Sequence, residues 1–546
     1  MAMPWQEGLS IVRRFSWFVF SQRAFEWVAF ALGPLIGVVV ALFAGQETSW
    51  DFRNYHWYNG YSLLTLRYGQ DILVAHHATY HNPGLDILYF LAGNALPPKL
   101  TLALLGALEG LNFSLLYLIA RSAFVQFAVA SSRLVAITTA AVGFLGGMSF
   151  LLIATTYFDN IVSILVLVSL YELLKLRETR PNGGRRAALA HGARAGLFIG
   201  AASALKLAIM PFAIGVVAAA LAVRSDTRGK IVLLVSLATA ASASFLVIGG
   251  PWMLHLWHAT GNPLFPYFNN IFDSPLLASD TYQPNFVPRS FWPALKFPFL
   301  FVADPRGTSD ALFADYKVLI AYCVLLFSLP LMWLCRPAER PFTDEHAFRI
   351  FVAFSAVSYV LWLAIFAIYR YIVILEMLAP VIVVATVGRW PVSQHLRWAI
   401  CIGLAIAALA GTTLSFGDRT RPGNKLVEIG VPPIRSPART LVILTGLQPV
   451  GFLIPSFPPE VSFVRIDGFL SSAAAPSLLR SEALARIAAF QGDLFVLYDI
   501  GEATRMREAL AAAGVSPLED TCRTITNNLM GSHKWCRLKR RSARAD

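Results

Sequence analysis

Long apolar runs recur through the first three quarters of the chain, and short polar segments separate them. Most runs are roughly 17–23 residues long, about the length that an α-helix needs to cross a bilayer. We therefore expect an α-helical polytopic membrane protein with about 11 transmembrane helices. The expected spans are 27–45, 99–120, 134–153, 161–176, 188–205, 207–223, 230–250, 316–335, 348–368, 371–388 and 398–416.

The amino-acid composition also indicates a membrane protein. Of the 546 residues, 56% are hydrophobic and only 14% are charged, whereas about a quarter of a soluble domain is charged. The net charge of +13 is of the sign found in nucleic-acid-binding proteins, but Lys and Arg also collect at the cytoplasmic ends of membrane helices. We adopt the second explanation and expect no nucleic-acid partner.

Positive charges alternate between successive connecting segments. With the N-terminus inside, the inside segments near 121–133, 177–186, 224–230, 336–349 and 389–397 hold most of the Arg and Lys, which is the positive-inside pattern. It predicts a basic, aromatic, amphipathic cytoplasmic segment 1–26. A membrane domain 27–416 follows, with outside loops 46–86 and 251–315, and then an outside segment 417–546. We expect a bacterial inner membrane, with this last segment in the periplasm.

The C-terminal segment has a different pattern. Residues 440–444 and 493–498 are short apolar runs typical of buried strands, while 481–490 and 502–513 have helical spacing. A small extracytoplasmic α/β domain is therefore expected. Cys522 and Cys536 lie close together in it, and this spacing in an oxidising compartment predicts a disulfide. Two free thiols are the alternative.

One polar and aromatic stretch, 50–86, directly follows the first apolar run. It contains Asp51, four histidines and several tyrosines. A loop that only joined two helices would need few of these residues, and loops at the membrane face often carry chemistry. Asp51 is therefore the leading catalytic candidate.

Further charged residues lie near the outer membrane face under this topology. Asp159 is in the second outside loop. Lys206 and Arg370 lie at the tips of tight hairpins, and Glu376 lies just inside the following helix. Ionisable residues at such positions are costly and usually have a partner or a function. The set suits an outward cavity in which cations hold a phosphate and a carboxylate deprotonates an acceptor hydroxyl.

Each of these residues has a structural alternative. Asp51 and Asp159 are each placed to cap a helix. Lys206 alternatively extends to the membrane interface with its aliphatic stem in the apolar region. Arg370 and Glu376 alternatively form a structural ion pair.

Histidines in the same stretch raise the question of a metal site. His77 and His81 are four residues apart, as two metal ligands on one face of a helix would be, but no helix is predicted there. We therefore assign no metal and no cofactor. Use of a divalent metal stays an open alternative, although nothing in the sequence supports it.

The stretch WDFRNYHWYNGYSLL resembles the first outside loop of the GT-C glycosyltransferases. These polytopic enzymes use polyprenyl-phosphate-linked sugars and include the protein O-mannosyltransferases and the aminoarabinose transferases of lipid A. HNPGLDILYFLAG and TTYFDNIVSILVLVSLYELLK are similar to their returning segment and second outside loop. SALKLAIMPF, HATGNPLFPYFN and YRYIVILEMLAP also look like segments of these transferases, so the resemblance extends over residues 27–414.

The resemblance implies an inverting transfer of a hexosyl or pentosyl group to an extracytoplasmic lipid, glycan or protein. It implies that Asp51 is the general base and that Arg370, with Lys206, holds the phosphate of the donor. Asp159 is assigned as a second catalytic acid. Where the family often has an Asp-Glu pair, this chain has Asp51-Phe52, which leaves the second acid open. The cavity lining is assigned to Tyr55, His56, Tyr58, His81 and Glu376.

Two other kinds of function would use the same outer charges. One is a transporter or flippase of a lipid-linked substrate, and the other is a polymerase or ligase of surface polysaccharide. Transporters often contain inverted repeats or helices broken at the midplane, whereas this sequence has no internal repeat and its acids cluster at one face. We therefore favour the glycosyltransferase, with the donor sugar, the acceptor, the oligomeric state and the role of the C-terminal domain open.

Overall fold

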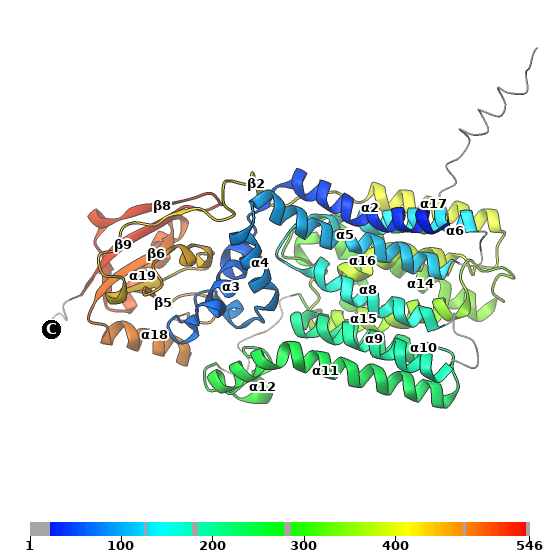
Figure 1. Ribbon diagram of the computed structural model, residues 1–546, viewed down its shortest axis with the longest axis horizontal. Helices are drawn as coiled ribbons and strands as arrows, with labels where there is room; N and C mark the ends of the chain where they lie inside the picture. Colours follow the sequence, from blue (N-terminus) through cyan, green and yellow to red (C-terminus); the bar gives the residue numbers. More distant parts are fainter. Residues whose placement is uncertain are drawn as a thin grey trace, which may run out of the picture.

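The computed structural model describes residues 22–124, 127, 129–176, 184–277, 286–472 and 477–541. The molecule is elongated (Figure 1). A bundle of long helices forms one end, and a sheet formed by the C-terminal strands lies at the other end. Helices α3 (Trp57–Leu64) and α4 (Gly84–Ala95) lie between the two. Most of the expected cytoplasmic segment, residues 1–21, lies outside the described residues.

The bundle contains, within the described residues, six helices that are long and apolar enough to cross a membrane. They belong to α2 (Gln22–Ala44), α5 (Pro98–Ala123), α9 (Gly184–Leu205), α11 (Thr227–Thr260), α15 (Glu345–Ile365) and α16 (Val373–Val387). Shorter apolar helices are α6 (Val129–Phe144), α10 (Met210–Ala222), α13 (Phe291–Ala303), α14 (Lys317–Leu334) and α17 (Gln394–Ala410). The multi-pass helical architecture is confirmed, but the count of 11 spans is not.

The outside loop 251–315 differs from the prediction at its start. The sequence places the end of a span at residue 250 and a long non-spanning stretch after it. In the structure, α11 continues through Pro251 to Thr260. The stretch 251–315 also contains the short helix α12 (Asn269–Phe272) and the whole of α13. This stretch therefore contains helical segments as well as connecting loops.

Glycines bring α2 and α5 into close contact. A Cβ atom added at Gly37 would lie within 2 Å of the Gly106 carbonyl oxygen, and one added at Gly110 would lie 2.1 Å from the Gly33 carbonyl oxygen. Only glycine permits two backbones to approach this closely, which is a common arrangement between membrane helices. This contact fixes the position of α2, at whose end the polar stretch begins.

The polar stretch 46–86 is folded and compact. It begins with β1 (Gln46–Glu47), which pairs antiparallel with β2 (Arg419–Thr420). It continues through the π-helix η1 (Phe52–His56), α3, and the 3-10 turns η2 (Arg67–Gly69) and η3 (His76–Tyr80). The Phe52 and Tyr58 side chains are buried inside it. Such burial holds the stretch in one conformation and gives its polar side chains fixed positions.

The C-terminal segment forms the expected α/β domain. Its sheet has the strand order β3-β8-β9-β6-β4-β5, with β7 on β9. Strands β4, β5 and β6 are parallel to one another, and every residue of β4 is buried. The bounds are β3 (Ile429–Gly430), β4 (Thr440–Leu444), β5 (Ser462–Arg465), β6 (Asp493–Asp499), β7 (Val515–Pro517), β8 (Arg523–Asn527) and β9 (His533–Arg540), with α18 (Leu478–Ala489) and α19 (Ala503–Ala512).

Two cysteines of this domain are covalently joined. Cys522 and Cys536 form a disulfide whose Cα atoms are 4.1 Å apart. Cys536 lies in β9, and Cys522 directly precedes β8. Cys323, Cys335 and Cys401 are free thiols in the helical bundle.

The polar stretch also contributes directly to the C-terminal domain. Ile72 pairs with Val464 in parallel, so the stretch extends the sheet beyond β5. Arg67 forms an ion pair with Asp71 at 2.7 Å and donates to the Pro459 carbonyl oxygen. These bonds join the C-terminal domain to the segment that carries Asp51.

Candidate active site

Arg370 lies at the centre of a cluster of charged side chains. Its Nη1 is 3.2 Å from Asp51 Oδ2 and 3.7 Å from Asp159 Oδ2, and its Nη2 is 2.5 Å from Asp310 Oδ2. The Lys206 ammonium donates to the other carboxylate oxygen of Asp159. The structure therefore brings together Asp51, Asp159, Lys206 and Arg370, which are far apart in the sequence.

Asp310 is the member of the cluster that sequence analysis misses. It lies between η7 (Pro305–Gly307) and α14. The loop that contains it holds several acids, and nothing in their spacing distinguishes this one. Its side chain is 38% exposed, whereas those of Asp51 and Asp159 are 16% and 3% exposed. Asp310 is therefore the most accessible of the three carboxylates.

Breaks between helices position these side chains. Asp51 lies directly before the π-helix η1. Lys206 has an extended backbone between α9 and η6 (Leu207–Ile209), and Arg370 lies in the 3-10 turn η8 (Tyr369–Ile372) before α16. Asp159 begins α8 (Asp159–Lys175), after a left-handed residue at Phe158. Because each residue lies at an end of a helix, the four side chains meet where the bundle ends.

The structural alternatives for these residues find little support. Among the described residues, Asp51 makes no side-chain cap hydrogen bond, and Asp159 is the first residue of α8, with Phe158 at the cap position. The Lys206 ammonium is in an ion pair with Asp159. Arg370 pairs with three aspartates, while Glu376 accepts from the backbone N–H groups of Met148 and Ser149.

Two tyrosine rings cover the cations. The Arg370 guanidinium carbon lies 4.1 Å from the ring centroid of Tyr157 and 5.3 Å from that of Tyr371. The Lys206 ammonium lies 5.2 Å from the ring centroid of Tyr371. Ring faces attract cations and shield them from water. The charges of the cluster therefore interact in a partly desolvated space, where they act more strongly than in water.

The electrostatics of the site favour a basic carboxylate. Burial raises the pKa of Asp51 above its usual range, and the Arg370 guanidinium opposes this effect. The Tyr55 hydroxyl donates to Asp51 Oδ2 at 3.3 Å, and burial raises the pKa of Tyr55 so that its proton stays in place. Burial also lowers the pKa of Lys206, against the effect of Asp159. A carboxylate with a raised pKa is a stronger base than an ordinary one.

The two cavity histidines predicted from the sequence are neutral at neutral pH. Burial lowers the pKa of His81 to about 3 and holds that of His56 well below its usual range. His56 Nδ1 is 2.6 Å from Asp86 Oδ1, where burial raises the pKa of the carboxyl. His81 Nε2 is 2.8 Å from the Tyr267 hydroxyl. Both rings act here as hydrogen-bonding groups without charge.

Tyr58 and Glu376 make their contacts elsewhere. The Tyr58 hydroxyl donates to Asp71 at the joint with the C-terminal domain. Glu376 binds the start of the short helix α7 (Gly147–Leu151). The sequence predicted both in the cavity lining because of their positions in the polar stretch and near the outer face. Their hydrogen bonds serve packing between segments.

In the part of the chain that the structure describes, no group of three or more His, Cys, Asp or Glu side chains is arranged to hold a metal ion. The three aspartates of the cluster surround the guanidinium of Arg370.

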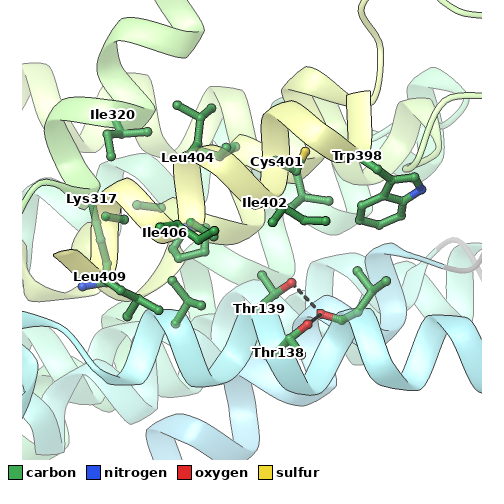
Figure 2. Close-up of a pocket in the computed structure, with 18 residues that line it drawn as sticks. Thr138, Thr139, Lys317, Ile320, Trp398, Cys401, Ile402, Leu404, Ile406 and Leu409 are labelled. Carbon is green, nitrogen blue, oxygen red and sulfur yellow. Dashed lines mark hydrogen bonds between the residues drawn. The ribbon is translucent and has the colours of Figure 1, made fainter. Parts of the chain in front are cut away.

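A separate groove lies within the helical bundle between α6 and α17. Its volume is about 270 Å³, and apolar side chains form most of its lining. Figure 2 shows Ile402, Ile406 and Leu409 of α17 opposite Thr138 and Thr139 of α6. Lys317 lies at one end, but its ammonium is bonded to Asp315 at 2.7 Å. The groove therefore offers no free charge and is not the candidate site.

Comparisons with known proteins give a distant likeness only. No protein-family profile and no curated protein matches the chain. The apo oligosaccharyltransferase of Archaeoglobus fulgidus gives a TM-score of 0.46 at 13% identity and covers 90% of this chain and 72% of that one. The oligosaccharyltransferase AglB of the same organism, in complex with an inhibitory peptide and a dolichol-phosphate, gives a TM-score of 0.43 at 14% identity. It covers 91% of this chain and 71% of that one. At these values the likeness assigns no activity to this chain.

Proposed function

We propose that the protein is a membrane glycosyltransferase that moves a sugar from a polyprenyl-phosphate-linked donor to an extracytoplasmic acceptor. The observation that carries this proposal is the cluster in which a carboxylate of raised pKa, Asp51, lies 3.2 Å from the guanidinium of Arg370. A base and an anion-binding cation therefore stand side by side at the end of a helical bundle. The transfer of a sugar from a phosphate-linked donor requires both of these groups.

The reaction proceeds by inversion at the anomeric carbon. Asp51 accepts the proton of an acceptor hydroxyl, whose oxygen forms a bond to the anomeric carbon. The bond between that carbon and the phosphate oxygen breaks, and its electron pair leaves with the polyprenyl phosphate. Arg370 and Lys206 stabilise the negative charge that develops on the phosphate. Asp159 holds Lys206 in place through their ion pair.

Donor binding requires a rearrangement of the carboxylates. The cluster contains three aspartates and two cations, so with all groups ionised its net charge is −1. An anionic phosphate is repelled by such a cluster until one carboxylate moves or takes up a proton. Asp310 is the most exposed carboxylate and lies on a connecting segment. The phosphate of the donor therefore takes the place of Asp310 on Arg370.

The orientation follows from the same proposal. A polyprenyl-linked sugar and an extracytoplasmic acceptor meet at the outer face of a bacterial inner membrane. The Arg370 cluster and the C-terminal domain then lie on the periplasmic side, and the arginine-rich end of the bundle faces the cytoplasm.

The test is the substitution Asp51→Asn in purified protein. Asn keeps the size of the side chain but cannot accept a proton, and loss of a general base typically lowers the rate by about 100- to 10,000-fold. The measurement is release of polyprenyl phosphate from a radiolabelled polyprenyl-phosphate sugar in the presence of an extract of the cell envelope. Binding of polyprenyl phosphate is expected to persist.

The matched control is Asp520→Asn, which alters an exposed acid of the C-terminal domain. Its turnover is expected to equal that of the unmodified protein. Turnover of Asp51→Asn near that level, with normal expression and thermal stability, would remove Asp51 from the mechanism. Wild-type protein that moves the lipid-linked sugar across a bilayer without transfer would favour a flippase instead.

A further inference from the structure

A line of aromatic rings leads from Asp51 to the C-terminal domain. The Tyr55 hydroxyl contacts Asp51 at 3.3 Å. The ring centroids of Tyr55 and His81 are 5.2 Å apart, those of His81 and His77 are 5.7 Å apart, and those of His77 and Phe469 are 5.8 Å apart. We call Tyr55, His81, His77 and Phe469 the aromatic strip.

A second set of rings flanks the strip. Trp50, which directly precedes Asp51, lies 6.0 Å from Phe469 between ring centroids and stacks on His76 at the same distance. At the other flank, Tyr267 stacks on His81 at 6.0 Å. Rings from three separate segments of the chain therefore converge on one surface.

Exposure of the strip is greatest at its Phe469 end. Phe469 is 49% exposed, and Tyr55, His77 and His81 are each partly exposed. Phe469 follows β5 at the carboxyl end of the parallel strands. The carboxyl ends of parallel strands are the usual position of ligand sites in open α/β sheets. A large apolar side chain exposed at this edge is thus placed to contact a ligand.

The strip carries no charge, in contrast to the Arg370 cluster. Burial lowers the pKa of His77 to about 4 and that of His81 to about 3, so both imidazoles are neutral at neutral pH. The surface therefore combines ring faces with neutral hydrogen-bonding groups. Sugars are complementary to such a surface. Their C–H faces stack on aromatic rings, and their hydroxyl groups donate and accept hydrogen bonds.

We propose that the aromatic strip is the acceptor-binding site and that the acceptor is a carbohydrate chain. This inference rests on the proposed function, because it places the acceptor hydroxyl at Asp51. The donor reaches Arg370 from the bilayer, whereas the strip leaves Asp51 toward the C-terminal sheet, at the opposite end of the molecule from the helical bundle (Figure 1). A chain of several sugar units laid along the strip presents its terminal hydroxyl to Asp51.

The test measures glycan binding without turnover. The probe is the set of water-soluble oligosaccharides released by mild acid from the envelope of the producing cells, and binding is followed by saturation-transfer difference NMR on the full-length protein in detergent. Phe469→Ala is expected to weaken binding by about 2- to 10-fold, the usual effect of losing one aromatic contact. Phe469→Tyr retains the ring and is expected to bind as the unmodified protein does.

The matched control is Leu478→Ala, which truncates another exposed apolar side chain of the same domain. It is expected to leave glycan binding unchanged. Polyprenyl phosphate serves as the second probe, and Phe469→Ala is expected to bind it normally. Equal glycan binding by Phe469→Ala and the unmodified protein, absence of glycan binding by the unmodified protein, or loss of polyprenyl-phosphate binding in Phe469→Ala would each overturn the proposal.

The same measurements separate this inference from the proposed transferase activity. Asp51→Asn is expected to lose transfer and to keep glycan binding, because Asp51 acts on the proton of the acceptor. A wild-type protein that binds glycan through Phe469 but transfers no sugar would contradict the transferase activity and leave a carbohydrate site at the strip.

Discussion

At the scale of single residues, Arg370 is the group on which the site depends. A guanidinium has five N–H donors in a planar fork and matches carboxylates and phosphates equally well. Here two of its nitrogens face three aspartates, and its Nε has no hydrogen-bond partner among the residues that the structure describes. In this state Arg370 is already neutralised by carboxylates. Any phosphate that it binds must compete with them.

Substitution Asp310→Asn is therefore expected to strengthen the binding of polyprenyl phosphate. It removes the most exposed of the competing charges while retaining the size of the side chain. Partly exposed ion pairs contribute about 0.2–1 kcal/mol, so the dissociation constant should fall by a factor of about 1.4 to 5. The measurement is a titration of purified protein with polyprenyl phosphate at low ionic strength, because salt screens the competition.

Asp493→Asn is the control for this prediction. It removes a carboxylate that is 38% exposed and pairs with Arg537, far from the cluster in the sequence and in a different domain. It should leave the dissociation constant unchanged. Weaker binding in Asp310→Asn would mean that Asp310 holds Arg370 in place for the donor. The proposal that the donor phosphate displaces Asp310 from Arg370 would then be wrong.

At the scale of helices and strands, the site depends on where helices end. Asp51, Asp159, Lys206 and Arg370 all lie at breaks between helices. The position of such a break depends on how the helices pack against one another. The glycine contact between α2 and α5 therefore bears on the position of Asp51, which lies beyond the end of α2.

Gly110→Ala is expected to lower the stability of the protein. The added Cβ would lie 2.1 Å from the Gly33 carbonyl oxygen, so the helices must separate. Overpacking of this kind costs about 1–3 kcal/mol, more than the gain of about 1 kcal/mol in helix propensity. The apparent midpoint of thermal unfolding in detergent should fall by several degrees.

Gly403→Ala on α17 is the matched control, because no atom of the described part of the chain lies within 4 Å of the Cβ that it adds. It should leave the midpoint unchanged or raise it slightly, since alanine favours helix more than glycine does. Equal midpoints for Gly110→Ala and the unmodified protein would show that α2 and α5 separate at little cost.

At the scale of the whole molecule, the polar stretch joins two domains. Arg465 of β5 is fully buried and donates to the carbonyl oxygens of Leu73 and Val74 in the stretch, and Ile72 extends the sheet. A buried guanidinium that lost these carbonyl partners would be costly. The C-terminal domain is therefore held in a fixed position against the segment that carries Asp51, as a site shared between them requires.

Impermeant maleimide is expected to label Asp520→Cys in intact cells and to leave Arg185→Cys unlabelled. The background is a variant in which Cys323, Cys335 and Cys401 are replaced and the disulfide is kept. The reason is the accumulation of Arg and Lys at the end of the bundle that carries Arg185, which retains this end in the cytoplasm. The measurement is the mass shift on a gel before and after cell lysis. Labelling of Arg185→Cys in intact cells, with Asp520→Cys protected, would reverse the orientation.

The sequence predicts the elements better than their limits. Apolar runs and the helical spacing of 481–490 and 502–513 correspond to observed helices, because burial imposes a period on the side chains. The strands β5, β7 and β8 are missed, because runs of three to five residues leave too little pattern to recognise. The eight-residue strand β9 is also missed, because its sequence HKWCRLKR is mostly polar and basic and has no apolar run. The number of spans is not confirmed, since the expected spans at α6, α8, α10, α14 and α17 are not among the six helices that are long and apolar enough to cross a bilayer.

The sequence alone determines which residue types the site uses and near which boundary they lie. Burying a charge among apolar runs is costly, and this makes Asp51, Asp159, Lys206 and Arg370 recognisable as candidates. Tertiary structure alone decides that Asp310 joins these four around Arg370, that Tyr58 and Glu376 make contacts elsewhere, and that Phe469 lies beside Trp50, which precedes Asp51. Each of these depends on distances between segments far apart along the chain. Such distances follow from the packing of whole helices and of the sheet, which a local pattern of apolar and polar residues does not encode.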